Sequence, residues 1–120
     1  MPDGKICYLE IPSTDIEASA RFYEKAFGWK SRLRGDGQRA FDDTTGAVSG
    51  AWVLGRPASR NAGMLTYVMV DSIEATLRKV TEAGGRVAAP FTPLGDSGEG
   101  YATFFDPTGN LLGLYQGRRS

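Results

Sequence analysis

The stretch Gly98–Tyr115, which reads GEGYATFFDPTGNLLGLY, decides the fold because it occurs twice in the chain. Its counterpart, Gly35–Trp52, reads GDGQRAFDDTTGAVSGAW and lies 63 positions earlier. Both copies have a Gly-acid-Gly motif followed by Phe-x-Asp-x-Thr-Gly-x-x-x-Gly-x-aromatic. Chance would not keep these residues in register, so the chain is interpreted as a duplicated unit.

Each copy is preceded by the pattern of a strand and a helix. The short apolar runs Ile6–Ile11 and Leu65–Val70 are flanked by breaking residues, which is typical of strands. Apolar residues at helical spacing follow both runs, and Gly28 and the pair Gly84-Gly85 end the two helices. Further strands are expected at about residues 29–34, 38–43, 48–54, 86–89, 99–105 and 111–116.

The starts of both helices have capping-box spacing. Thr14 and Glu17 stand at the first helix, and Asp71 and Glu74 stand at the second. In such a box a short polar side chain accepts from a backbone N–H while the glutamate reaches back to the cap. We therefore expect Thr14 and Asp71 to cap the helices.

The order of elements is βαβββ, twice. The two modules span about residues 5–54 and 63–117, and the Gly- and Pro-containing segment Leu54–Gly63 joins them. We predict one α+β domain over residues 1–120, in which the short linker keeps the modules in contact.

The composition excludes several classes of site. Fourteen basic and fourteen acidic residues give a formal charge of zero, which leaves no excess positive charge for nucleic acid. The chain contains no histidine. It therefore cannot form a His-ligated zinc site, a two-histidine facial triad, a Ser-His-Asp triad or a Cys-His dyad.

Cysteine usage and hydropathy favour the cytoplasm. Cys7 is the single cysteine, so no intramolecular disulfide is available, and the N-terminus has no charged-then-apolar leader. No apolar stretch approaches the roughly 18 residues that cross a bilayer. We expect a cytoplasmic protein without nucleic-acid or membrane partners.

Three motifs resemble one known family. They are Glu10-Ile11-Pro12 followed by Asp15, the run Arg21–Trp29, and the turn Asp106–Asn110. They are similar to the vicinal oxygen chelate superfamily, which includes glyoxalase I, extradiol dioxygenases, fosfomycin-resistance enzymes and bleomycin-binding proteins. The resemblance implies two βαβββ modules in a cup-shaped, mostly antiparallel eight-stranded sheet around a cavity, with helices outside, often as a homodimer. It leaves the function open, because this fold hosts many chemistries.

The resemblance also implies four positions for a divalent metal, one on each of four strands. The matching positions here are Tyr8, Gly50, Leu65 and Gly113. Glycine has no side chain, leucine has no donor atom, and neutral tyrosine is a poor ligand for Ni²⁺, Zn²⁺ or Mn²⁺. We therefore expect no metal, no other cofactor, and neither glyoxalase I nor extradiol dioxygenase activity.

Strand alternation predicts what lines the cavity instead. If Tyr8 faces the cavity, Glu10 does too, because side chains alternate between the faces of a strand. The same rule puts Tyr67 and Met69 on the cavity face of the strand that begins at Leu65. Trp52 and Tyr115 are placed on the face that they share with Gly50 and Gly113. The candidate ligand-binding residues are Tyr8, Glu10, Trp52, Tyr67, Met69 and Tyr115. Such a surface suits a small apolar or aromatic molecule.

Alternatives stay open for these residues. The aromatic side chains fit a ligand pocket or ordinary core packing. Glu10 is a candidate general base, an anchor for a cationic ligand, or a carboxylate paired with arginine at a dimer interface. We favour a homodimeric, metal-independent binding protein for a small molecule. The alternative is a metal-independent lyase or isomerase that uses Glu10 as acid or base on a small carbonyl compound.

Overall fold

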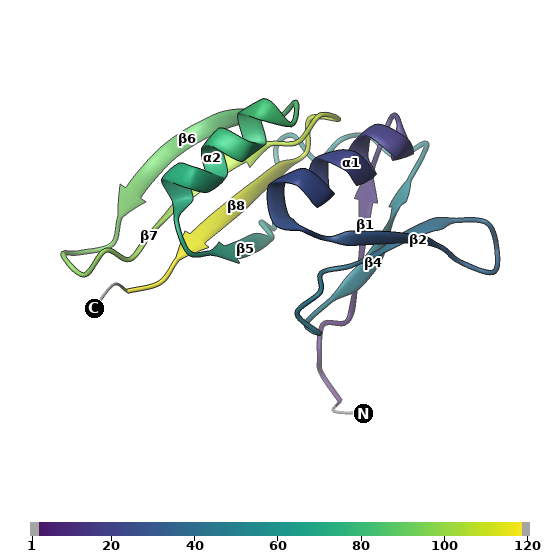
Figure 1. Cartoon of the computed structure of the whole chain (residues 1–120), viewed down its shortest axis with the longest axis horizontal. Coiled ribbons are helices and arrows are strands. Elements are labelled where there is room, and N and C mark those ends of the chain that lie inside the picture. Colours follow the sequence, from purple (N-terminus) through teal and green to yellow (C-terminus); the bar gives the residue numbers. More distant parts are fainter. Residues whose placement is uncertain (1–2, 119–120) are drawn as a thin grey trace.

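The computed structural model describes residues 3–118 (Figure 1). Over these residues the chain follows the predicted order, strand, helix and three strands, twice. The elements are β1 Tyr8–Pro12, α1 Ile16–Phe27, β2 Lys30–Leu33, β3 Arg39–Asp42, β4 Ser49–Val53, β5 Tyr67–Val70, α2 Ile73–Glu82, β6 Arg86–Pro93, β7 Gly100–Phe105 and β8 Leu111–Gln116. Within this part of the chain, neither helix is long and apolar enough to span a membrane.

The strands form two four-stranded sheets, one in each module. The order is β1-β4-β3-β2 in the first sheet and β5-β8-β7-β6 in the second. β1 is parallel to β4 and β5 is parallel to β8, whereas the other pairs are antiparallel. The α+β class and the duplicated module are confirmed. The eight strands are divided between two sheets that do not close into one.

Both helices begin one residue later than the capping pattern predicts. The N-caps are Asp15 and Ser72, and each side chain accepts a hydrogen bond from the backbone N–H three residues on. The prediction of Thr14 and Asp71 is wrong because the next residue is itself a strong N-cap type. Gly28 ends α1 as predicted, in the left-handed conformation at φ 76°.

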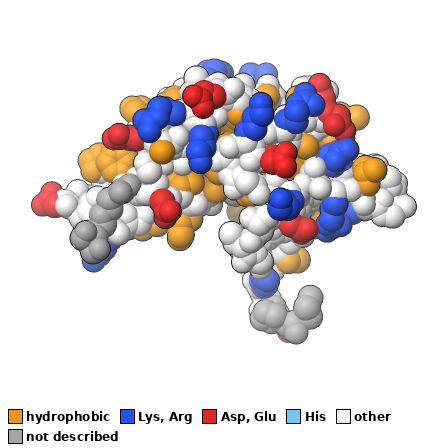
Figure 2. Space-filling model, in the orientation of Figure 1, with side chains coloured by type: hydrophobic (Ala, Val, Ile, Leu, Met, Phe, Trp, Pro, Cys, Tyr) orange, Lys and Arg blue, Asp and Glu red, His pale blue; other side chains and the backbone are white. Residues whose placement is uncertain are grey.

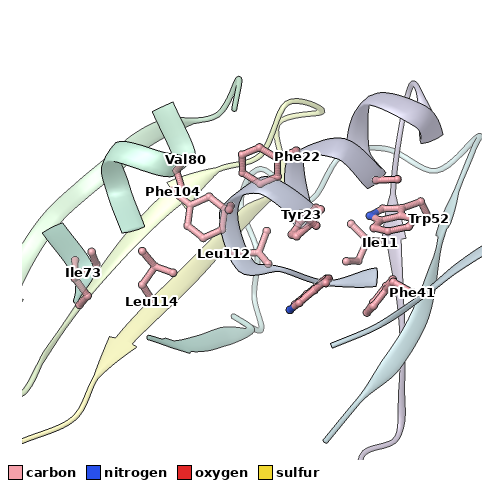
Figure 3. Close-up of a cluster of buried hydrophobic side chains, with 14 residues drawn as sticks. Ile11, Phe22, Tyr23, Phe41, Trp52, Ile73, Val80, Phe104, Leu112 and Leu114 are labelled. Carbon is pink, nitrogen blue, oxygen red and sulfur yellow. The ribbon is translucent and has the colours of Figure 1, made fainter. Parts of the chain in front are cut away.

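The two modules share one hydrophobic core. Both helices lie on the same side of the sheets and contact each other (Figure 1). Beneath them, Tyr23 of α1 lies between Trp52 of the first module and Phe104 of the second (Figure 3). The Tyr23 hydroxyl donates a hydrogen bond to Asp106 Oδ2 at 2.8 Å. Helix α1 is therefore fixed to the second module as well as to its own sheet.

The turn between β7 and β8 joins the modules through polar contacts. Asp106 is buried, and its Oδ1 accepts hydrogen bonds from the backbone N–H groups of the three residues Thr108, Gly109 and Asn110. Asn110 then donates from Nδ2 to the carbonyl oxygen of Pro12 at 2.8 Å. It also accepts from the backbone N–H of Ser59 in the linker at 2.8 Å. The turn thus holds β1 and the linker together.

The corresponding turn of the first module is one residue longer. Residues 43–48 join β3 to β4, whereas residues 106–110 join β7 to β8. Because side chains alternate along a strand, one extra residue reverses the two faces of the strand that follows. The face of each sheet that lies away from the helices is called the open face below. The two modules therefore present opposite sets of β4 and β8 positions on their open faces.

Trp52 lies in the core as a result. Its side chain is 1% exposed, and its ring lies 5.0 Å from Phe41 and 6.0 Å from Tyr23 between ring centroids. The prediction that Trp52 lines a cavity beside Tyr8 is wrong. The extra turn residue places Trp52 on the helix side, whereas its repeat counterpart Tyr115 lies on the open face of the second sheet.

Candidate functional site

The open face of the first sheet carries two polar side chains that contact arginines of the same chain. Tyr8 and Glu10 alternate along β1 with the buried Ile11, so both lie on this face. The Tyr8 hydroxyl accepts a hydrogen bond from Nη1 of Arg34 at 2.5 Å. Glu10 Oε1 lies 2.5 Å from Nη2 of Arg56, which belongs to the linker. The structure therefore favours the interpretation of Glu10 as an arginine-paired carboxylate, with the arginine in the same chain.

Arg34 connects Tyr8 to a second carboxylate. Its Nε and Nη2 donate to the two carboxylate oxygens of Asp36 at 3.3 and 3.0 Å. The backbone N–H of Gln38 and then the Arg34 guanidinium hold the pKa of Asp36 below its ordinary value. Both groups stay charged near neutral pH, so this end of the first open face carries a neutralised pair.

The open face of the second sheet is aromatic. Tyr67 and Met69 lie on β5 opposite Gly113 and Tyr115 of β8 in the parallel register. Met69 is 76% exposed and Tyr67 is 47% exposed, whereas Leu114 between the two β8 positions is fully buried under the helices. Three of the predicted ligand-binding residues, Tyr67, Met69 and Tyr115, thus share one face.

Tyr67 lies directly over Gly113. A Cβ atom at Gly113 would lie 2.4 Å from Cδ2 and Cε2 of the Tyr67 ring, closer than atoms approach in proteins. The ring therefore occupies the space that a side chain on this position would need. Glycine at 113 and tyrosine at 67 require each other for this arrangement, in which an aromatic ring covers bare backbone.

Tyr115 is bound to Glu99, which is not among the predicted site residues. The Tyr115 hydroxyl donates a hydrogen bond to Glu99 Oε2. This bond raises the pKa of Tyr115 above its ordinary value of 10.0, so the phenol stays protonated and remains a donor. Glu99 stands in the turn between β6 and β7, which the backbone bond from Leu94 N to Glu99 O closes at 2.8 Å.

A wide groove of about 1060 Å³ separates the modules. Its walls are the end of α1, the 43–48 turn, strand β5 and the start of α2. Figure 2 shows the hollow beneath the helices and hydrophobic side chains along the border of the half that contains β5. A smaller pocket of about 120 Å³ lies between β1 and β8 and has Glu10 in its wall.

One chain does not gather all the predicted residues around one cavity. Tyr67 and Met69 line the wide groove, and Glu10 lines the small pocket. Tyr8 and Tyr115 lie on the two separate open faces. The expectation of one shared wall depends on a closed sheet, and the two sheets here remain apart.

The residues at the family's four metal positions do not fit a metal. Leu65 has no donor atom, and Tyr8 is occupied with Arg34. A side chain at Gly50 would point into the core, where its Cβ would lie 2.0 Å from the carbonyl oxygen of Leu9. A side chain at Gly113 would collide with the Tyr67 ring. Within residues 3–118 no three His, Cys, Asp or Glu side chains are grouped to hold a metal ion.

Three charged residues of the open faces were missed by sequence reasoning. They are Arg34, Arg56 and Glu99, which bind Tyr8, Glu10 and Tyr115. A signal existed for one of them, because Glu99 is the acid of the repeated Gly-acid-Gly motif. Arg34 and Arg56 lie outside the repeated stretch Gly35–Trp52, so the repeat did not select them.

Comparison with known proteins places the chain in a family. A sequence model described as "Glyoxalase/Bleomycin resistance protein/Dioxygenase superfamily" matches residues 5–114. The chain belongs to this superfamily. It is 31% identical over 119 residues to a Mycobacterium tuberculosis protein named "Putative glyoxylase CFP32", covering 93% of this chain. It covers 45% of that protein, so it corresponds to a little under half of its length.

A fungal relative matches along most of its length. The chain is 30% identical over 114 residues to a "Glyoxylase-like domain-containing protein" of Didymella fabae, covering 89% of each. Among solved structures, a glyoxalase/bleomycin resistance protein/dioxygenase family enzyme from Burkholderia phytofirmans has a TM-score of 0.74 at 17% identity, covering 94% of this chain and 98% of that chain. The fosfomycin resistance protein FosX from Mesorhizobium loti has a TM-score of 0.73 at 17% identity, covering 98% and 94%. These two structures share the fold.

Proposed function

We propose that this protein binds a small apolar or aromatic molecule on the open faces of its sheets without a metal ion. The observation that carries the proposal is the Tyr67 ring lying over Gly113, because aromatic surface occupies a position that the family resemblance assigns to a metal ligand. Partly exposed Tyr67 and Tyr115, with Met69, offer apolar area to a ligand ring, and few polar groups are needed to orient it.

A thermal-shift screen tests the proposal. Small aromatics and keto acids are added to the protein with chelator, and again with Mn²⁺, Ni²⁺ or Zn²⁺. A compound that binds the folded state raises the melting temperature by mass action. We expect aromatic compounds to raise it equally with chelator and with metal. Shifts that occur only with added metal would contradict the proposal.

Paired variants locate the site. Tyr67→Ala removes part of the aromatic face and should abolish the ligand-induced shift. Leu33→Ala is the matched control, because Leu33 is an exposed apolar residue on β2 whose register partner Arg39 pairs with Glu17 of α1. Leu33 therefore lies on the helix side of the first sheet, and its loss should leave the shift unchanged.

We further propose that a second copy of the chain completes the site in the cytoplasm. Ile6, Met69 and Tyr67 are large apolar side chains that one chain leaves exposed around the wide groove. A patch of this kind is typical of an interface. Sedimentation velocity should show a dimer at micromolar concentration, and Met69→Glu should shift it toward monomer. A wild-type protein that sediments as a monomer at every concentration would contradict this proposal.

The alternative function, a metal-independent lyase or isomerase, has one observation in its favour. Glu10 lines the small pocket between β1 and β8, so its carboxylate can meet a small carbonyl compound. The ion pair with Arg56 opposes this alternative, because the guanidinium already occupies Oε1 of the carboxylate that would have to meet the substrate. Turnover of a keto acid that Glu10→Gln abolishes would favour this alternative over simple binding.

A further inference from the structure

A row of side chains crosses the second open face close to Glu99. Tyr115 on β8 is the register partner of Met69 on β5 and of Tyr101 on β7. Ala102 and Leu114, the neighbours of the two tyrosines along their strands, are fully buried on the helix side. The two tyrosines and Met69 therefore lie side by side on the open face.

Glu99 lies at the end of this row and has one weakly paired oxygen. Its Oε2 accepts the hydrogen bond from Tyr115. Its Oε1 lies 3.9 Å from Nε of Arg118, whose side chain is 81% exposed. An ion pair this long, with so exposed a partner, is screened by water and adds little. The Glu99 side chain is itself 24% exposed, so it can accept a further hydrogen bond from a bound molecule.

The other carboxylates near the tyrosines of the open faces are engaged more tightly. Glu10 meets Arg56 at 2.5 Å, and Asp36 receives two hydrogen bonds from Arg34. Their charges are already compensated by a guanidinium of the same chain. Of these three carboxylates, Glu99 thus has the weakest pairing with a cation.

A cation attached to an apolar body matches this arrangement. An ammonium group donates a charge-assisted hydrogen bond to a carboxylate and is also attracted to the faces of aromatic rings. We infer that Glu99 and Tyr115 form the recognition point for the ammonium group of a small aromatic amine, whose ring lies against Tyr101, Tyr115 and Met69. The inference rests on the proposed binding function and adds the class of its ligand.

Titration calorimetry with three matched probes tests the inference. The probes are phenethylamine, phenylethyl alcohol and phenylacetate, which differ in charge on nearly the same apolar body. At low salt and near-neutral pH we expect the amine to bind about 10-fold more tightly than the alcohol, with the carboxylate weakest. Added salt should reduce the difference, because the contact is partly exposed to solvent.

Variants assign the preference to the carboxylate. Glu99→Gln keeps an acceptor for Tyr115 and should remove the preference for the amine, whereas Glu99→Asp should retain most of it. Arg118→Ala removes the competing cation and should strengthen amine binding by about 2-fold. Glu82→Gln, at the exposed end of α2, is the matched control for loss of one carboxylate and should change nothing.

The outcomes distinguish failure of this inference from failure of the proposed binding function on which it rests. Equal affinities for amine and alcohol, or an amine preference that survives Glu99→Gln, would overturn the inference and leave apolar binding in place. Failure of all three probes to bind the wild-type protein would overturn both. If the melting curve shows that Glu99→Gln does not fold, the other two variants still test the inference. It then requires that Glu99→Asp keeps most of the amine preference and that Arg118→Ala binds the amine more tightly.

Discussion

The two modules share a repeated sequence, yet they differ in what they place on their open faces. The first module has Trp52 in the core and two tightly paired polar groups outside, whereas the second has Tyr67, Tyr101 and Tyr115 on its open face. The two sequence copies have equal length, but the 43–48 turn takes up one residue more than the 106–110 turn, so Phe41 pairs with Gly50 whereas Phe104 pairs with Leu112. Loop length therefore decides, as much as residue type, whether an aromatic side chain stabilises the fold or is free to meet a ligand.

The counterpart residues Trp52 and Tyr115 should show the largest difference in stability between the two modules. Trp52→Ala leaves a cavity in the shared core and should lower the free energy of unfolding by about 3–5 kcal/mol. Tyr115→Ala removes a partly exposed side chain and should cost about 1 kcal/mol. Urea unfolding of both variants measures the difference. Equal costs would show that the two rings have similar surroundings, against the reversal of faces.

The aspartates of the two turns, Asp106 and Asp43, should show the next largest difference in their contribution to stability. Asp106 is buried and accepts hydrogen bonds from three backbone groups, Tyr23 and Asn110, so Asp106→Ala should cost about 3 kcal/mol or more. Asp43 accepts from Thr45 and Val48 in a turn that is open to solvent. Asp43→Ala should cost about 1 kcal/mol in the same urea experiment. A larger cost for Asp43 would contradict the role of the second turn as the junction of the modules.

The counterpart glycines test the reversal directly. A Cβ at Gly50 meets backbone of β1 at 2.0 Å and cannot be relieved by rotating a side chain, so Gly50→Ala should cost about 3 kcal/mol. A Cβ at Gly113 meets the half-exposed Tyr67 ring, which can swing outward, so Gly113→Ala should cost about 1 kcal/mol. The Gly113 variant should nevertheless lose ligand-induced stabilisation. Retained ligand binding by Gly113→Ala would remove Tyr67 from the site.

Alkaline pH gives the smallest expected effect. Burial, followed by the Asp106 carboxylate, raises the pKa of Tyr23 well above its ordinary value of 10.0. The folded state favours the neutral phenol of Tyr23. Its contribution to the free energy of unfolding is therefore complete below about pH 10 and is lost as the pH rises further. Above that pH, the free energy of unfolding of the wild-type protein should fall more steeply than that of Tyr23→Phe. The difference in slope should be up to about 1.4 kcal/mol per pH unit. Parallel stability curves for the two proteins would exclude this coupling.

Much of the fold could be predicted from the sequence because its signals are local. The repeat, the helix end at Gly28 and the turns around Asp43 and Asp106 each depend on neighbouring residues. The caps were misplaced by one position, since Thr14 and Asp15 are both acceptable cap residues and only the backbone conformation distinguishes them.

The candidate site could be predicted only where the register was correct. Tyr67 and Met69 were found by alternation along β5, and Glu10 by alternation along β1. Trp52 was misplaced because the repeat equates Gly50 with Gly113, whereas the strand register of the two modules differs by one residue. Contacts such as Glu10 with Arg56 depend on how the linker folds back over β1, which no periodic pattern records.

The most direct test of the account is calorimetry on protein stripped of metal. An aromatic ligand from the thermal-shift screen is titrated into chelator-treated wild-type protein, and then into the same protein with Mn²⁺, Ni²⁺ or Zn²⁺ added. The account predicts one affinity in all four titrations and its loss in Tyr67→Ala. Binding that requires the metal, with one ion retained per chain, would contradict it.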